Sequence, residues 1–228
     1  MLKRRPKDTK RFRSEPKKRI AQAPRPPRNR GKFLVVGIGA SAGGLDACKN
    51  LLGSLSASKG MAFILVQHLD PTHESMMVEL LAAHTSMTVV QAMDGMPIEP
   101  DHFYVIPPGT YLSVDEGALR LSQPLARHGA RLPFDYLLHT LATNFGPRAV
   151  CVILSGTGTD GSLGLKTIKE NRGLVIVQDP EEAAFDGMPR SAIMTGAVDF
   201  VLPVAKIGEA LVTYDQQMAG SDKHSGHP

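Results

Sequence analysis

Length and composition exclude several classes of protein. The chain has 228 residues, 42% of them hydrophobic, which suits one domain with a buried core plus a tail. No apolar run approaches the ~18 residues of a membrane span, so a transmembrane protein is excluded. Trp is absent and aromatic residues make up 5%, which disfavours stacking on nucleic-acid bases. Two cysteines, Cys48 and Cys151, are too few for a disulfide scaffold or a cysteine-rich zinc site, and we expect a cytoplasmic protein.

Charge divides the chain into two unequal parts. Residues 1–32 contain 14 Lys or Arg and 2 Asp or Glu, a balance of +12, whereas the other 196 residues contain 12 and 20, a balance of −8. The first part has five prolines and few apolar side chains, so its composition predicts a disordered, basic, Pro-rich tail. Such a tail would attract an acidic partner, either nucleic acid or an anionic membrane surface. The remainder is mildly acidic and is not predicted to bind nucleic acid.

From residue 33 onward, strand and helix patterns alternate along the chain. FLVVGIG at 33–39 is a continuous apolar run, typical of a strand buried on both faces. In chain order, the patterns predict a strand at 33–39, a helix at 45–55, a strand at 61–67, a helix at 73–84, strands at 87–92 and 103–107, a β-hairpin at 111–122, a helix at 134–145, a strand at 149–156, a helix at 162–171, a strand at 174–178, a helix at 188–196, a strand at 197–202 and a closing helix at 204–218.

This alternation predicts the α/β class. We expect a three-layer α/β/α sandwich with a doubly wound, mainly parallel sheet of about seven strands and a β-hairpin. One domain should occupy residues 33–212, and residues 213–228 should hold the end of the closing helix and a frayed C-terminus.

Three of the predicted strands are followed by segments with reactive side chains. Ser41, His68 and Asp160 each come just after a buried strand. Open α/β sheets bind ligands beyond the carboxyl ends of their strands, so we expect these side chains to meet there. A histidine can take the proton of a serine hydroxyl, and a carboxylate on its other ring nitrogen fixes the tautomer and stabilises the imidazolium. The three residues are therefore the parts of a Ser-His-Asp triad.

Glycines crowd two of these segments. Gly39-x-Ser41-x-Gly43 would place the serine on a tight strand-to-helix turn, where small neighbours let a substrate approach. The glycines of residues 155–161 would let the backbone pass close to the substrate and present N–H groups to a developing oxyanion. The predicted donors are the amides of Ala42 and of Thr157, the residue before Gly158.

The same residues also fit roles without catalysis, which stay open. Gly37-x-Gly39-x-x-Ala42 fits a loose dinucleotide-binding fingerprint, although Gln67-His68 stands where that fingerprint wants an acidic residue. Ser41 and Asp160 could instead cap helices, and a single histidine at a strand end is often structural. An ordinary α/β-hydrolase fold is excluded, because its triad order is Ser, Asp or Glu, His and its serine follows several strands.

Six segments occur in one collinear order, which is more specific than any of them alone. They are VGIGASAGG (36–44), VQHLDPTH (66–73), YVIPPG (104–109), RLPFD (131–135), LSGTGTDG (154–161) and DGMPRSAI (186–193). In this order they resemble the catalytic domain of the CheB family of chemotaxis protein-glutamate methylesterases. The resemblance runs from about Phe33 to Leu211.

The resemblance implies a function and roles for these residues. Ser41 would be the nucleophile, His68 the general base and Asp160 its orienting carboxylate. Members hydrolyse γ-glutamyl methyl esters on chemoreceptors and release methanol, and some deamidate receptor glutamines; no metal or organic cofactor is implied. Arg131 and Arg190 fall in matching segments and could contact an acidic helix around the ester, although Arg190 could equally be a structural ion-pair partner.

The chain departs from the best-known members of that family. Those carry an N-terminal receiver domain that gates the active site by phosphorylation, and 32 basic, proline-rich residues cannot form one. The motif details look most like the methylesterase modules of hybrid signalling proteins, so we expect a chemoreceptor or a related signalling protein as substrate. The alternative is a non-catalytic binding module that uses the same cleft, although binding alone would not require all three triad groups.

Overall fold

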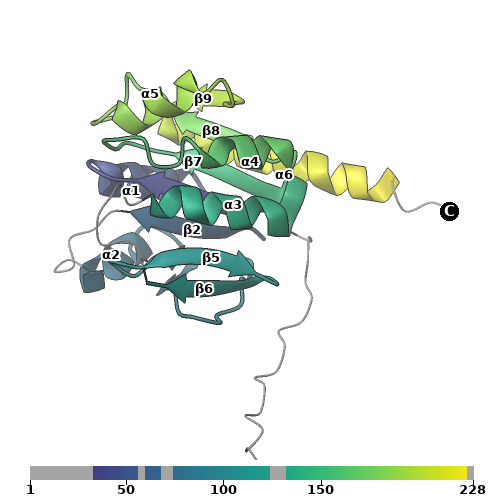
Figure 1. The fold of residues 1–228 in the computed structure, drawn as a ribbon, viewed down its shortest axis with the longest axis horizontal. Helices are drawn as coiled ribbons and strands as arrows, with labels where there is room; N and C mark the ends of the chain where they lie inside the picture. The colour runs from purple at the N-terminus through teal and green to yellow at the C-terminus, as the bar shows by residue number, and fades with distance from the viewer. Residues whose placement is uncertain (1–32, 56–59, 68–73, 124–131, 225–228) are drawn as a thin grey trace, which may run out of the picture.

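The computed structural model describes residues 33–55, 60–67, 74–123 and 132–224 (Figure 1). The tail predicted at residues 1–32 lies outside this part of the chain, as do His68 and Arg131.

A seven-stranded sheet forms the centre of the molecule, with the strand order β3-β4-β2-β1-β7-β8-β9. Its strands are β1 (Val35–Ala40), β2 (Ala62–Gln67), β3 (Thr88–Gln91), β4 (His102–Val105), β7 (Ala149–Ile153), β8 (Leu174–Gln178) and β9 (Phe200–Leu202). All six pairings between neighbouring strands of this sheet are parallel. The predicted doubly wound sheet is confirmed.

A separate hairpin joins β5 (Tyr111–Asp115) to β6 (Ala118–Ser122) in antiparallel pairing. Its two turn residues, Glu116 and Gly117, have φ values of 50° and 80°. Two-residue turns of this left-handed kind match the twist of antiparallel strands, which explains why the hairpin turns here. The predicted hairpin is confirmed at its predicted position.

Helices cover both faces of the sheet. They are α1 (Gly44–Ser54), α2 (Glu74–Ala82), α3 (Pro133–Phe145), α4 (Gly164–Glu170), α5 (Gly187–Met194) and α6 (Val204–His224), with a short 3-10 turn at Gly146–Arg148. One buried cluster joins the sheet to α3, α4, α5 and the hairpin, and a second joins its other face to α1, α2 and α6 (Figure 1). The predicted α/β/α sandwich is therefore confirmed.

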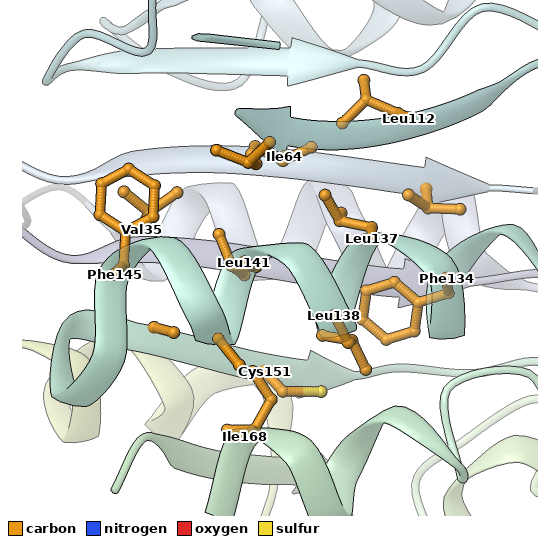
Figure 2. Packing of buried hydrophobic residues seen from close by; sticks show 14 of the residues in the cluster. Val35, Ile64, Leu112, Phe134, Leu137, Leu138, Leu141, Phe145, Cys151 and Ile168 are labelled. Carbon is orange, nitrogen blue, oxygen red and sulfur yellow. The ribbon is translucent and has the colours of Figure 1, made fainter. Parts of the chain in front are cut away.

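The two glycines of β1 lie against the side chains of α3. Figure 2 shows α3 lying along the strands, with Leu137, Leu138 and Leu141 between helix and sheet and Phe134 at its first turn. A Cβ atom on Gly37 would lie 3.2 Å from the Leu141 side chain, and one on Gly39 would lie 2.3 Å from the Phe134 ring. Close packing of α3 therefore explains both glycines. No dinucleotide-binding role, the alternative that their spacing had left open, is needed to explain them.

The ends of three predicted elements were wrong by three residues or more. One is the strand predicted at 149–156, since β7 ends at Ile153. The strand predicted at 197–202 is reduced to Phe200–Leu202, because the Asp199 carboxylate accepts the Val175 N–H at 2.8 Å and takes a donor from the neighbouring strand. The closing helix predicted to end at 218 continues to His224, so residues 219–224, expected to be frayed or to follow the helix, belong to it. Among the described helices, none combines the length and apolarity that crossing a membrane requires.

Candidate active site

The strand order places one crevice at the centre of the sheet. The chain builds outward from β1 through β2 on one side and from β7 through β8 on the other, so the order reverses between β1 and β7. Open α/β sheets bind ligands beyond the carboxyl ends of their strands at such a reversal. Ser41 follows β1 directly, and residues 154–161 follow β7.

These two segments leave the sheet side by side. Leu154 N–H donates to the Gly39 carbonyl at 2.9 Å, and Ser41 N–H donates to the Ser155 carbonyl at 3.1 Å. The ladder between β1 and β7 thus continues past the last strand residues and brings the two loops into register.

Ser41 and Asp160 line the same small pocket in this crevice. Its other lining residues are Ala40, Val66, Phe134, Thr157 and Met188. The cavity is about 10 Å³, close to the room that a single water needs. The structure thus brings together in one small pocket three residues that were predicted from the sequence, Ser41, Asp160 and Thr157.

His68 lies outside the described residues, but the residue before it does not. Gln67 ends β2 and is the register partner of Ala40, the residue before Ser41. His68 and Ser41 therefore each follow one residue of the directly paired Gln67 and Ala40. Neighbouring strands lie only about 4.8 Å apart. This register supports the predicted contact between His68 and Ser41, which stays a prediction.

Asp160 caps a helix from across the fold. Its side chain is 7% exposed, and its Oδ2 and Oδ1 atoms accept the N–H groups of Phe134 and Asp135, both at 3.0 Å. These are the free amides of the first turn of α3, where the helix dipole also favours a negative charge. A carboxylate offers about four acceptor sites, so it can accept more than two hydrogen bonds.

Sequence reasoning therefore anticipated capping by Asp160 only in part. The carboxylate does cap a helix, but the helix is α3, which precedes it in the chain, and not the one that follows it. Capping by Ser41 is not found: the N-cap of α1 is Gly43, with φ of 70° and no side-chain bond. Within the described residues, the Ser41 hydroxyl therefore takes no part in capping α1.

A second carboxylate, Asp135, escaped the sequence analysis. Its Oδ1 atom accepts the Gly164 N–H at 2.7 Å, so α3 caps the start of α4 while Asp160 caps α3. Burial, and then the nearby charge of Asp160, raise the pKa of Asp135 above the usual carboxyl range. The sequence signals were an acidic residue in the first turn of a predicted helix and its place at the end of the RLPFD segment.

Both amides that were predicted as oxyanion donors lie in the described part of the chain. Within the described chain, neither the Ala42 nor the Thr157 amide donates a hydrogen bond to another backbone group. Gly158 has φ of 92°, a conformation that favours glycine, and its carbonyl accepts the Ser191 hydroxyl at 3.2 Å. These features are compatible with donors aimed at a substrate, and the assignment stays a prediction.

Arg190 lies on the exposed surface of α5 in an ion-pair group. Its guanidinium donates to Asp186 Oδ2 at 2.5 Å and to Glu181 Oε1 at 3.0 Å. The hydrogen bond from Arg190 lowers the pKa of Asp186. Of the two roles considered for Arg190, these contacts favour the structural one.

The described residues give little support to catalysis by a cysteine thiolate or by a bound metal ion. Burial raises the pKa of the Cys48 thiol to about 12 and also raises that of Cys151, so both thiols stay protonated at neutral pH. In the residues that the structure describes, no cluster of three or more His, Cys, Asp or Glu could hold a metal ion.

Comparison with known proteins agrees with this geometry. The family model described as CheB methylesterase matches residues 36–211. This chain belongs to the CheB methylesterase family. The crystal structure of the CheB methylesterase catalytic domain of Thermotoga maritima superposes with a TM-score of 0.74 at 30% sequence identity, covering 79% of this chain and 98% of that one.

Curated relatives of the CheB family differ widely in length. The chain is 33% identical to protein-glutamate methylesterase FrzG of Myxococcus xanthus over 91% of its own length and 62% of the relative. It is 34% identical to a putative protein-glutamate methylesterase/protein-glutamine glutaminase of Leptospira interrogans, over 81% of this chain and 96% of that protein. It spans only 14% of an uncharacterized 104.1 kDa protein of Rhodobacter capsulatus, to which it is 44% identical over 138 residues.

Proposed function

We propose that this protein is a serine hydrolase that removes methyl groups from γ-glutamyl methyl esters on chemoreceptors or related signalling proteins. The observation that carries the proposal is the shared pocket of Ser41 and Asp160 at the sheet's reversal point. Family membership and the names of the relatives, protein-glutamate methylesterase among them, support the same reaction.

The proposed reaction uses three side chains and two amides. The Ser41 hydroxyl attacks the ester carbonyl while His68 takes its proton, and Asp160 holds the imidazole and stabilises its charged form. The developing oxyanion accepts hydrogen bonds from the Ala42 and Thr157 amides. Collapse of the tetrahedral intermediate expels the methoxy group, which His68 protonates to methanol, and leaves an ester between Ser41 and the glutamyl side chain.

Water completes the cycle by the same steps. His68 takes a proton from water, the resulting hydroxide attacks the acyl-enzyme, and Ser41 leaves with that proton restored. The product is a glutamate carboxylate. With a glutamine in place of the ester the leaving group is ammonia, and one Leptospira relative carries glutaminase in its name, so we include deamidation in the proposal.

Trapping and turnover test the proposal together. A serine-directed phosphonate should attach to Ser41, as located by mass spectrometry, and Ser41→Ala should lower methanol release from a methyl-esterified receptor by several orders of magnitude. Ser162→Ala is the matched control, because the Ser162 hydroxyl is buried and has no hydrogen-bond partner in the described chain.

The outcome separates catalysis from binding. Methanol release by Ser41→Ala at the wild-type rate would overturn the assignment of the nucleophile. If the wild-type protein binds the receptor but releases no methanol, the alternative holds, namely a module that binds its partner without catalysis.

A further inference from the structure

Ser155 connects three loops at the carboxyl edge of the sheet. Its side chain is 1% exposed, and it follows β7 directly before the glycine-rich segment 156–161. The Ser155 N–H donates to Gln178 Oε1 at 2.8 Å, at the end of β8. Its carbonyl and its hydroxyl both bond to the loop that carries Ser41.

The bonds to that loop hold the candidate nucleophile on both sides. The Ser155 carbonyl accepts the Ser41 N–H at 3.1 Å, and the Ser155 hydroxyl donates to the Ala42 carbonyl at 2.9 Å. One residue therefore fixes both ends of the Ser41–Ala42 dipeptide, which contains the nucleophile and one predicted oxyanion donor. A Cβ atom on the next residue, Gly43, would lie 2.8 Å from the Ser155 hydroxyl, so this contact needs a glycine there.

The same hydroxyl also holds the loop after β8. Phe185 N–H donates to Ser155 Oγ at 3.0 Å, and the Phe185 carbonyl accepts the Gly156 N–H at 2.9 Å. Gly156 in turn accepts the Met188 N–H at 2.8 Å, and Met188 lines the pocket beside Ser41. One hydroxyl thus accepts from one loop and donates to another, with both bonds at ordinary length.

We propose that Ser155 is a positioning residue for the reaction of Ser41, acting through the hydrogen bond from its hydroxyl to the Ala42 carbonyl. The inference rests on the proposed function. Ser155 touches neither the proposed substrate nor the reacting atoms; it holds the peptide groups on both sides of the Ser41–Ala42 peptide, and so the position of the Ala42 N–H that the oxyanion meets.

Loss of the hydroxyl should harm turnover more than substrate binding. It leaves the Ala42 carbonyl and the Phe185 N–H without this partner, so the two loops can move relative to each other. A misplacement of about 1 Å in a reacting group costs on the order of 100-fold in rate. The ester itself binds through contacts that Ser155 does not make, so KM should change little.

The experiment compares three variants on a small methyl ester, at a temperature well below every melting midpoint. Ser155→Ala and Ser155→Cys should each lower kcat by ~10–100-fold while KM stays within about threefold of the wild-type value. Cysteine nearly keeps the volume and loses the strong donor, so it supplies the answer even if alanine prevents folding. Ser162→Ala, which removes a buried hydroxyl from the same loop but no hydrogen bond, should leave both constants unchanged.

Phosphonate trapping supplies a second readout. The rate constant for modification of Ser41 should fall in both Ser155 variants in proportion to kcat, because trapping needs the same nucleophile and the same amides. A merely structural role would lower the melting temperature and leave these rates unchanged in the folded protein.

Each result decides between the claims. If Ser41→Ala is inactive but both Ser155 variants keep kcat within threefold, the inference about Ser155 is wrong and the proposed function stands. A loss that falls on KM alone would also overturn the inference, because it would place Ser155 in substrate binding. If Ser41→Ala turns over normally, the proposed function fails and the inference fails with it.

Discussion

Substitution of Gly39 by alanine tests how the core of this protein supports its site. Gly39 lies in β1 and needs no left-handed backbone, so alanine suits its conformation and the effect is steric. The new Cβ atom would lie 2.3 Å from Cδ1 and 2.4 Å from Cε1 of the Phe134 ring. Carbon atoms pack at about 3.5–4.0 Å, so the ring or the strand must move by more than about 1 Å.

The ring has little room to move. A Cβ atom on Gly161 would lie 2.6 Å from the same Phe134 ring, so two glycines lie against the ring, and Phe134 is buried. Overpacking of this kind costs about 1–3 kcal/mol. A loss of 1 kcal/mol lowers the melting temperature of a domain of this size by about 2–4 °C.

The displacement should also reach the site. Phe134 N–H donates to Asp160 Oδ2, so a shift of the first turn of α3 moves the proposed orienting carboxylate. A shift of about 1 Å there should lower kcat on the order of 100-fold. Gly39→Ala should therefore lose both stability and turnover, whereas a change confined to the core would cost stability alone.

Thermal unfolding and ester turnover, measured on the wild type and four variants, check this reasoning. Phe134→Leu removes ring atoms, so the double variant Gly39→Ala/Phe134→Leu should be less destabilised than the sum of the two single variants. Gly53→Ala is the control, because its Cβ would meet nothing within 4 Å and alanine suits a helix better by ~0.5–1 kcal/mol. Wild-type stability and turnover in Gly39→Ala, or strict additivity in the double variant, would refute the argument.

Three further predictions concern charge. The raised pKa of Asp135 means that its ionisation disfavours the folded state. The free energy of unfolding should therefore fall as pH rises from the ordinary carboxyl pKa toward the raised one. Asp135→Asn keeps an acceptor for the Gly164 N–H and should lack this fall in urea titrations across that pH range. Arg190→Glu should lower the melting temperature by breaking its ion pairs but leave turnover of receptor and small ester equally unaffected, and a loss on the receptor alone would instead place Arg190 in substrate contact. Deletion of residues 1–32 should leave small-ester turnover unchanged but slow demethylation of an acidic or membrane-embedded substrate at low salt. This difference in rate should narrow as added salt shortens the Debye length to ~8 Å. Equal rates at low salt would show that the tail takes no part in targeting.

Local sequence patterns determined most of the fold of this protein. Continuous apolar runs such as residues 33–39 have no polar face, so they predict strands buried between two layers of helices. Asp115-Glu116-Gly117 supplies residues that accept a left-handed turn, and the hairpin forms there. Ser41, His68 and Asp160 were predicted as a site because each follows a strand, and strands in a parallel sheet point the same way.

Local patterns did not predict the ends of some elements. The last strand begins at Phe200 because the Asp199 side chain takes an amide of β8, and the closing helix extends to His224 beyond its expected end. The structural role of Gly37 and Gly39 could not be predicted from the sequence either. The glycine spacing that fits a dinucleotide-binding fingerprint also allows α3 to pack closely on β1.

Only the tertiary structure decided how the candidate site is held. Asp160 caps α3 over a separation of 26 residues from Phe134, and Ser155 reaches Ala42 across 113 residues. The sequence around a serine or an aspartate does not distinguish a side chain that bonds to its own segment from one that bonds to a distant segment. Which partner it meets is set by the packing of whole elements against each other, because the buried polar groups of separate loops must satisfy one another once water is excluded.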